Sequence, residues 1–346
     1  FKQKTAYEIM PSLVGSEMCI RDSSYVIKHP ESMRFCGFQN VTINLPQAAY
    51  RAGGKLDTFF DELDKMLELV VRAHLQKRRF VQYLMSGPDM PLWEIGKPAL
   101  DGRPYVDLNK ATYIVGLIGL NEAVQRLCGR ELHEGDEPFK LGLKIIAFLY
   151  LRIQELSRKH NMKFALEESP AESASRRLAK VDLTLFPEAA EFVRGDIDRD
   201  EVYYTNSIHL RADAPVDIVT RIMFQSKFHP QIESGAIIHA FVGEQRPHPD
   251  SIYALVKKTF FKTQCAQLTI SPEFTICEDC HATSRGLLNS CPACSSPHVY
   301  GITRIVGYYS RVNNWNSSKL AELRDRQRGN YKLANPAPRP GAVSAM

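Results

Sequence analysis

The fold is indicated first by the stretch Phe38-Gln39-Asn40-Val41-Thr42-Ile43-Asn44-Leu45-Pro46, in which apolar and polar residues alternate. This alternation predicts a strand, because successive side chains of a strand point to opposite faces of a sheet. Pro46 has no backbone N–H to donate and should end the strand. A pattern typical of a helix follows from about Lys55 to Met85, where leucine, phenylalanine and valine recur at helical spacing.

The rest of the chain continues this alternation of helices and short strands. We predict helices near Lys110–Cys128, Pro138–Lys159, Ala174–Lys180 and Pro249–Cys265, and short strands at Lys163–Leu166, Val202–Leu210 and Ala236–Val242. Helices that alternate with short apolar strands favour an α/β domain. The proline-rich end of the chain is predicted to be disordered.

Length and composition exclude several classes of protein. The chain has 346 residues, of which 44% are hydrophobic, enough for two domains or for one large domain with an appendage. The same numbers exclude intrinsic disorder, collagen-like repeats and a small disulfide scaffold. The longest apolar run, Ala111–Leu120, is far shorter than the roughly 20 residues of a membrane-spanning helix. We therefore expect a soluble protein with no membrane partner.

The positive charge is concentrated at the C-terminal end. Residues Gly301–Met346 contain eight lysines and arginines against two acidic residues, so they carry +6 while the whole chain carries +5. A globally basic nucleic-acid-binding protein is therefore disfavoured, and we expect no nucleic-acid partner. A solvated basic helix is the simpler interpretation of this tail, and contact with phosphate or an acidic partner is the alternative.

Four of the eight cysteines form the two pairs Cys277-Glu278-Asp279-Cys280 and Cys291-Pro292-Ala293-Cys294, separated by ten residues. Two such turns can place four thiolates in a tetrahedron, which suits a structural zinc ion. An iron–sulfur cluster or two redox disulfides are alternatives. His281 and His298 are nearby and are expected to be bystanders. Paired cysteines without a visible secretory signal indicate a reducing, cytoplasmic location.

The segment Glu168-Ser169-Pro170-Ala171-Glu172-Ser173 has the signature of a helix start. Serine at the N-cap, proline at the first helical position and glutamate at the third form a capping box. The free N–H groups of such a terminus can bind a phosphate. From these residues alone an ordinary helix start is favoured, because Glu167, Glu168 and Glu172 would repel an anion unless they point away.

Two further residues carry weak signals by themselves. Cys36, in Met33-Arg34-Phe35-Cys36-Gly37, could be a radical or nucleophilic thiol at a loop tip, although cysteines are more often packed in a core. Gly307, in Arg304-Ile305-Val306-Gly307-Tyr308-Tyr309-Ser310, looks like a glycine at a turn or strand end. Cys128 and Cys265 lie in helical patterns and are expected to be buried.

The first residues differ in character from the rest. Residues 1–23 read FKQKTAYEIMPSLVGSEMCIRDS, have no sustained helix or strand period, and resemble the translated read-through of a sequencing adapter. We expect this segment, which includes Cys19, to be non-native. Native sequence would then begin near Ser24, in the middle of a domain, as in a C-terminal fragment of a longer protein. The alternative is a genuine but unusual N-terminus.

Several motifs together resemble one family. They are RFCGFQNVTINLPQAAYRAG, GRPYVDLNKATYIVGLIGLNE, EESPAESASRRLAKVD, YYTNSIH, the paired CxxC motifs and TRIVGYYSRVNNWNSSKLAELRDR. From about Ser24 to Tyr331 the chain resembles the C-terminal half of the anaerobic (class III) ribonucleoside-triphosphate reductases. The resemblance implies the second half of a ten-stranded α/β barrel of the glycyl radical type over residues 24–270. It further implies a zinc module at 271–300, a glycyl radical region at 301–331 and a disordered tail at 332–346.

The resemblance also implies roles for single residues. Arg304, Gly307 and Tyr308 match the R-x-x-G-Y motif, so Gly307 would hold a glycyl radical installed by an iron–sulfur, S-adenosylmethionine-dependent activase. The radical would pass to a cysteine thiyl, either Cys36 or a cysteine upstream of this fragment. Substrate phosphate would bind at the helix start formed by Ser169, Pro170, Ala171, Glu172 and Ser173.

The resemblance implies the anaerobic reduction of ribonucleoside triphosphates to 2′-deoxyribonucleoside triphosphates. It also implies that the protein is a homodimer. The fragment alone is expected to be inactive, because the ATP-binding regulatory region and first half-barrel would precede it. Formate or a cysteine pair elsewhere would supply the electrons. Two alternatives remain: another glycyl radical enzyme, in which the paired CxxC would be unexpected, or a zinc-ribbon nucleic-acid-binding protein, which leaves the α/β domain unexplained.

Overall fold

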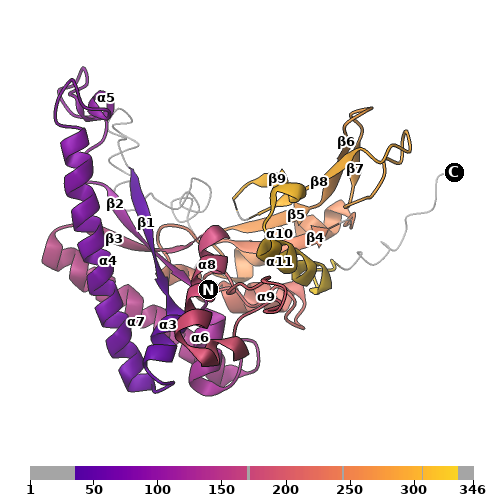
Figure 1. Ribbon diagram of the computed structural model, residues 1–346, viewed down its shortest axis with the longest axis horizontal. Coiled ribbons are helices and arrows are strands. Elements are labelled where there is room, and N and C mark those ends of the chain that lie inside the picture. The colour runs from indigo at the N-terminus through magenta and orange to yellow at the C-terminus, as the bar shows by residue number, and fades with distance from the viewer. Residues whose placement is uncertain (1–35, 170–171, 244, 306, 334–346) are drawn as a thin grey trace.

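The computed structural model describes residues 36–169, 172–243, 245–305 and 307–333. Its centre is a parallel sheet of strands β1 (Gly37–Asn44), β2 (Thr112–Ile118) and β3 (Lys163–Glu168) in that order. Helix α4 (Leu56–Leu84) packs against β1, and helix α7 (Asp136–His160) packs against β3 and α4. Figure 1 shows α4 as the long helix standing beside this sheet. The predicted α/β class, the long helix and the strand at Lys163 are confirmed.

The two faces of this sheet differ because its side chains alternate. Phe38 and Ile43 of β1 enter the main core with Tyr113 of β2 and Phe164 of β3. Asn40 and Thr42 therefore point to the opposite face. A bulge between Phe38 and Asn40, with Gln39 at φ 32°, sets this register. One face of the sheet is consequently apolar and covered by helices, and the other carries polar side chains.

The helix predicted over Lys110–Cys128 is wrong in its first half. Residues Thr112–Ile118 form strand β2, all seven of them buried, and helix α6 (Leu120–Cys128) begins only after Gly119, which has φ 75°. A strand buried on both faces has a continuous apolar sequence, which periodicity cannot distinguish from a buried helix. The β-branched and aromatic residues of this run were the signal for a strand.

The strand predicted over Val202–Leu210 is also wrong. In the structure this segment is irregular and makes single bridges, Arg194 to Tyr203 and Ile118 to Asn206. Its side chains are used for hydrogen bonds to distant residues: the Tyr204 hydroxyl donates to Asp182 over 2.9 Å, and Thr205 Oγ1 donates to Glu122 over 2.5 Å. Aromatic and β-branched residues here serve tertiary contacts, which overrides their strand propensity.

The second parallel sheet has two strands. Strands β4 (Ile238–Gly243) and β5 (Leu268–Pro272) are parallel and joined by helix α10 (Pro249–Lys262), which confirms the predicted helix and the strand near Ala236. The other helices are α3 (Leu45–Arg51), α5 (Trp93–Gly96), α8 (Glu172–Leu185), α9 (Ile218–Gln225) and α11 (Ser317–Arg328), with short 3₁₀ turns η2 (Pro187–Glu191), η3 (His229–Gln231) and η4 (Val312–Asn314).

The cysteine-rich region is a separate antiparallel sheet. Its strands are β6 (Phe274–Cys277), β7 (Thr283–Arg285), β8 (Val299–Arg304) and β9 (Tyr309–Arg311), in the order β7-β6-β8-β9. Figure 1 shows this sheet projecting from the side of the molecule opposite α4, with α11 below it. Among the helices that the structure describes, none has the length and apolar character needed to cross a membrane.

Candidate active site and metal centre

Polar side chains gather on the face of the three-stranded sheet opposite the main core. Thr42 Oγ1 and Ser169 Oγ are 3.0 Å apart, and Ser169 Oγ donates to Asn40 Oδ1 over 3.4 Å. Asn40 Nδ2 donates to the carboxylate of Glu167. Ser169 follows β3 directly and is 3% exposed, so this cluster is held between the edge of β1 and the end of β3.

Gly116 of β2 lies between these two strands, paired with Thr42 on one side and Glu167 on the other. A Cβ atom at Gly116 would collide with Ser169 Oγ and the Asn40 side chain. The absence of a side chain on the middle strand therefore opens the space that the polar cluster occupies.

Helix α8 is tied to the same face through a buried carboxylate. Asp182 accepts hydrogen bonds from Asn44 Nδ2 over 2.8 Å, from Gln47 Nε2 over 2.7 Å and from the Tyr204 hydroxyl over 2.9 Å. Burial raises the pKa of Asp182. β1, α3, α8 and the segment that carries Tyr204 meet at this one group, which holds the C-terminal end of α8 against this face.

Glu168 points away from that cluster. Its carboxylate accepts a hydrogen bond from the backbone N–H of Ile237 over 2.9 Å and lies 3.1 Å from His209 Nε2 and 3.5 Å from His229 Nε2. Burial lowers the pKa of His229. Glu168 thus connects the end of β3 to the segment before β4, and its charge is directed away from Ser169.

The loop that carries Gly307 connects β8 and β9. Its base is closed by a hydrogen bond from the N–H of Ile305 to the carbonyl of Tyr308 over 2.9 Å. Gly307 is exposed, and its φ lies outside the left-handed region. Apart from its chain neighbours, no atom of the described residues lies within 4 Å of where a Cβ would be. Neither backbone conformation nor packing requires glycine here, so the reason for this residue has to be sought in its chemistry.

Arg326 of α11 holds the base of this loop. Its guanidinium donates to the carbonyl of Arg304 over 2.7 Å and to that of Ile305 over 3.0 Å. The same group pairs with Glu322 and lies over the ring of Phe241 at 4.2 Å. Burial alone would raise the pKa of Glu322, but Arg326 and Lys319 lower it to about 2. The ion pair is therefore fully charged at neutral pH.

The four paired cysteines meet as predicted. Their sulfur atoms all lie within 4.8 Å of one another, with Cys277 Sγ 3.6 Å from Cys294 Sγ and Cys280 Sγ 3.5 Å from Cys291 Sγ. Backbone N–H groups point at the sulfurs, as in Cys280 N to Cys277 Sγ over 3.5 Å. Four converging sulfurs without a carboxylate or imidazole suit Zn²⁺ and leave no open coordination position. His298 instead lies beside Asp279, at 3.2 Å.

Comparison with known proteins identifies the family. The model of the family described as anaerobic ribonucleoside-triphosphate reductase matches residues 3–328. The chain belongs to this family. The matched range includes residues 3–23, which lie outside the described residues, and the expected non-native origin of residues 1–23 stays a prediction.

Anaerobic ribonucleoside-triphosphate reductases of characterised bacteria are distant relatives. The Escherichia coli (strain K12) protein is 22% identical over 308 residues, which cover 83% of this chain and 41% of that protein. The Haemophilus influenzae protein is 22% identical over 310 residues with the same coverage. The chain thus spans about two fifths of the length of the curated relatives it matches.

Solved structures of anaerobic ribonucleotide reductases share the fold. One has a TM-score of 0.70 and 21% identity, covering 86% of this chain and 45% of its own. The Thermotoga maritima enzyme in complex with dATP and CTP has a TM-score of 0.65 and 22% identity, covering 85% and 45% of the two chains.

The predicted phosphate site falls partly outside the described residues. Helix α8 begins at Glu172 in the structure, Pro170 and Ala171 lie outside the described residues, and Ser173 is exposed in the first turn. The described hydrogen bonds of Ser169 go to Thr42 and Asn40. The N-cap role of Ser169 therefore stays a prediction.

Cys36 lies just before β1. Its carbonyl accepts a hydrogen bond from the N–H of Thr112 over 2.9 Å, and its partly buried side chain packs against the main core.

Sequence inspection missed Asn40, Thr42, Glu167 and Arg326. The signal for Asn40 and Thr42 was present, because polar residues alternating along an apolar strand must share one face.

Proposed function

We propose that this chain is the C-terminal part of an anaerobic ribonucleoside-triphosphate reductase that converts ribonucleoside triphosphates to 2′-deoxyribonucleoside triphosphates. The observation that carries the proposal is Gly307, a glycine that the fold does not require, in an R-x-x-G-Y loop of a chain that belongs to this family. A radical at this Cα is delocalised between an amide nitrogen and a carbonyl. Glycine also allows the radical centre to be planar without side-chain strain.

The parallel strands are proposed to be half of a barrel. β1, β2 and β3 form one parallel sheet and β4 and β5 a second, and Glu168 contacts residues before β4. Closing these strands with an equal number from the rest of the protein gives the ten-stranded α/β barrel that the family resemblance implies. The polar face with Asn40, Thr42 and Glu167 would then face the barrel interior.

In the proposed mechanism the radical stored at Gly307 generates a thiyl at Cys36 or at a cysteine outside this chain. The thiyl takes the 3′-hydrogen of the ribose, and the 2′-hydroxyl leaves as water once protonated. Replacing that hydroxyl by hydrogen consumes two electrons and two protons. A cysteine pair that forms a disulfide supplies all of them, whereas formate oxidised to carbon dioxide supplies both electrons and one proton, and the second proton comes from solvent. Asn40 and Glu167, already hydrogen-bonded to each other, offer a donor and an acceptor to the ribose hydroxyl groups.

The start of α8 is proposed to bind the substrate phosphates. Glu168 is turned toward His209 and Ile237, so one of the acidic residues that would oppose an anion is directed elsewhere. Ser169 stands between this helix and the polar cluster, which joins a phosphate site to a sugar site. The Thermotoga maritima enzyme in complex with dATP and CTP supports nucleotide binding by the family.

Zinc is proposed as the bound metal of Cys277, Cys280, Cys291 and Cys294, where it would hold the two turns together as a structural ion. The partners are proposed to be the radical-installing activase, a second copy of the protein and ribonucleoside triphosphates. A cytoplasmic location fits four thiols that must remain reduced.

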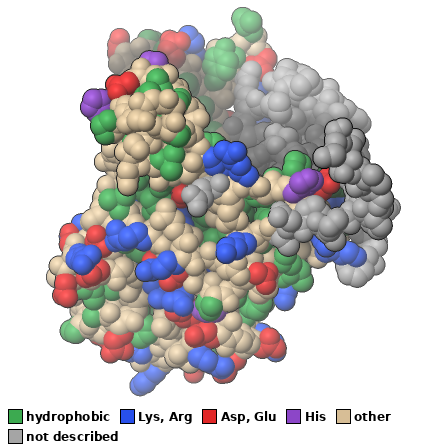
Figure 2. Space-filling view, turned by 90° about the vertical axis from the view of Figure 1, so that its right-hand side faces the viewer, with side chains coloured by type: hydrophobic (Ala, Val, Ile, Leu, Met, Phe, Trp, Pro, Cys, Tyr) green, Lys and Arg blue, Asp and Glu red, His purple; other side chains and the backbone are tan. Residues whose placement is uncertain are grey.

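The nucleic-acid-binding alternative has weak support from the charge distribution. Three arginines of α11 pair with acidic side chains: Arg324 with Glu201, Arg326 with Glu322 and Arg328 with Asp325. Figure 2 shows basic and acidic side chains interspersed over the face in view. Charges that are already paired leave little to release counterions from DNA or RNA.

The test is anaerobic reduction of CTP by the complete protein after treatment with its activase. Gly307→Ala should abolish product formation. Gly87→Ala is the matched control, because Gly87 also has an ordinary φ and no atom within 4 Å of an added Cβ. Equal turnover by both variants would refute the proposed role.

A further inference from the structure

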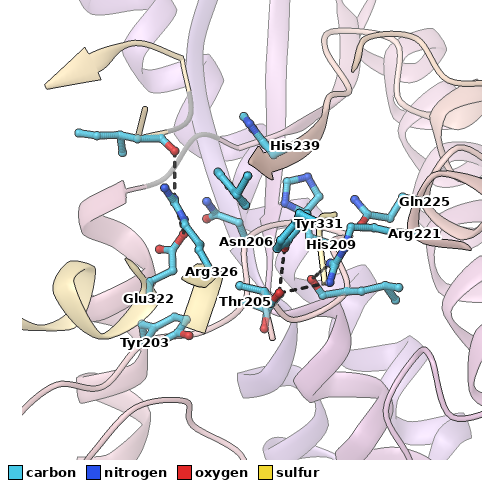
Figure 3. Close-up of a pocket in the computed structure, with 14 residues that line it drawn as sticks. Tyr203, Thr205, Asn206, His209, Arg221, Gln225, His239, Glu322, Arg326 and Tyr331 are labelled. Carbon is cyan, nitrogen blue, oxygen red and sulfur yellow. Dashed lines mark hydrogen bonds and ion pairs between the residues drawn. The ribbon is translucent and has the colours of Figure 1, made fainter. Parts of the chain in front are cut away.

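The two ends of helix α11 contact two different functional regions. Near its C-terminal end, Arg326 donates to the carbonyls of Arg304 and Ile305 at the base of the Gly307 loop. Figure 3 shows Arg326 with these contacts and with its ion-pair partner Glu322. The N-terminal end of α11 lies beside α8, the helix whose start is proposed to bind the substrate phosphates (Figure 1). One helix therefore spans the distance between the proposed phosphate site and the loop.

Arg176 joins α8 to α11. It lies in α8 about one turn after the start of the helix, and its guanidinium donates to Ser317 Oγ over 3.0 Å and to Ser318 Oγ over 2.5 Å. These serines are the first two residues of α11, and Ser318 is buried. A side chain from the proposed substrate helix thus holds the first turn of the helix that follows the Gly307 loop.

Asp200 balances the charge of Arg176. A cation at the N-terminus of a helix is unfavourable, because the helix dipole is positive there. The Arg176 guanidinium donates to the carboxylate and to the backbone carbonyl of Asp200, each over 2.5 Å, and Ser317 Oγ donates to the same carbonyl over 3.0 Å. Hydrogen bonds from Lys180 and from Arg176 lower the pKa of Asp200. The Arg176 side chain is therefore fixed between α8, α11 and the loop that carries Asp200.

We propose that Arg176 is a positioning residue that couples nucleotide binding at α8 to the placement of the Gly307 loop, an inference that rests on the proposed function. The two states are α11 held against α8, as in the structure, and α11 released from it. A phosphate bound at the start of α8 stabilises the first turns of that helix, including the turn that carries Arg176. Arg176 in turn holds the start of α11, and Arg326 of α11 holds the base of the loop.

The test is hydrogen exchange of the complete protein, without activation, in the presence and absence of CTP. In the original protein, saturating CTP should slow the exchange of the amides of α11 and of the loop from Gly307 to Arg311 by about fivefold, the lower end of typical coupling between sites. Arg176→Met keeps the length of the side chain and removes its hydrogen bonds. CTP should still bind to this variant, but it should no longer slow these amides.

Reciprocity gives a second measurement of the same coupling. Because each site must affect the other by the same factor, Arg176→Met should also weaken CTP binding about fivefold, as measured by titration calorimetry. Replacing the acceptors instead, with Ser317→Ala and Ser318→Ala together, should reproduce both effects while Arg176 is intact. Alanine is a good helix former, so these two changes keep the helix itself.

Lys180→Met is the matched control. Lys180 lies one turn further along α8 and pairs with the same carboxylate of Asp200 at 2.9 Å, but its described contacts do not include α11. This variant should keep both the affinity for CTP and the slowing of exchange within about twofold of the original protein, since it loses only an exposed ion pair.

Three results would overturn the proposal. If CTP slows exchange in Arg176→Met by the same factor as in the original protein, Arg176 has only a structural role. If CTP binds to the original protein without slowing exchange in α11 and the loop, the sites are not coupled, although the proposed function is unaffected. If the original protein does not bind CTP, the proposed phosphate site itself is wrong, and the coupling is wrong with it.

Discussion

Replacement of Arg326 tests how the radical loop is held. Arg326→Met keeps most of the side-chain volume and the contact with Phe241, but removes the hydrogen bonds to the carbonyls of Arg304 and Ile305. Hydrogen bonds from a charged donor contribute about 1.5–3 kcal/mol each, and breaking a buried ion pair costs about 3–5 kcal/mol. Glu322 keeps Lys319 as a partner at 2.8 Å. We therefore expect the free energy of unfolding to fall by about 3 kcal/mol, near the lower end of the cost of breaking a buried ion pair.

The assay combines urea unfolding of the chain with hydrogen exchange of the amides from Gly307 to Arg311. In Arg326→Met these amides should exchange faster by a factor of roughly 100, which corresponds to about 2.7 kcal/mol of lost local stability. Arg328→Met is the control, because Arg328 is 67% exposed on the same helix and a surface ion pair contributes about 0–1 kcal/mol. Similar losses in both variants, or unchanged exchange in the loop, would refute the role given to Arg326.

The remaining predictions concern the metal, the substrate site and the pH dependence. Cys277→Ser should release zinc and destabilise the antiparallel sheet, as measured by metal analysis and circular dichroism; iron in the original chain would contradict the zinc assignment. Ser169→Ala should cost about 1–2 kcal/mol and weaken nucleotide binding, measured by calorimetry on the complete protein. Ser175→Ala is the control: it removes a buried 2.7 Å hydrogen bond to the Tyr204 carbonyl and should lower the free energy of unfolding by as much without weakening nucleotide binding. If the two variants bind nucleotide equally well, Ser169 has only a structural role. Burial lowers the pKa of His74 from 6.5 to about 4, so its contribution to stability should be fully present above pH 6.5 and lost as pH falls toward 4. If the free energy of unfolding of His74→Phe changes with pH over this range as steeply as that of the original chain, His74 is not the cause of the pH dependence.

The cysteine cluster could be predicted from the sequence because its chemistry is local. Each CxxC turn places two sulfurs on one side of the chain, and only ten residues separate the turns. The structure then needed only one antiparallel sheet to bring the turns together. Gly307 was found by its motif, but the sequence could not tell that neither packing nor φ requires a glycine there.

The polar cluster could not be predicted, because it joins residues far apart in the chain. Asn40 and Glu167 are 127 positions apart, and their meeting depends on the register of three parallel strands and on the bulge at Gln39. A shift of one residue would turn Asn40 into the apolar core. The sequence also predicted a solvated basic tail, whereas Arg326 and Lys319 are buried around Glu322. Their spacing within one helix is visible in the sequence, but their burial depends on the packing of α11 against β4.

The most direct test of the central claim is the electron paramagnetic resonance spectrum of the complete protein after anaerobic activation. A radical at Gly307 should give a doublet split by the remaining α-hydrogen, and protein grown on α-deuterated glycine should lose this splitting. Gly87→Ala should keep the doublet and Gly307→Ala should lose it. A doublet that persists in Gly307→Ala, or an activated enzyme that turns over without any glycyl signal, would contradict the account.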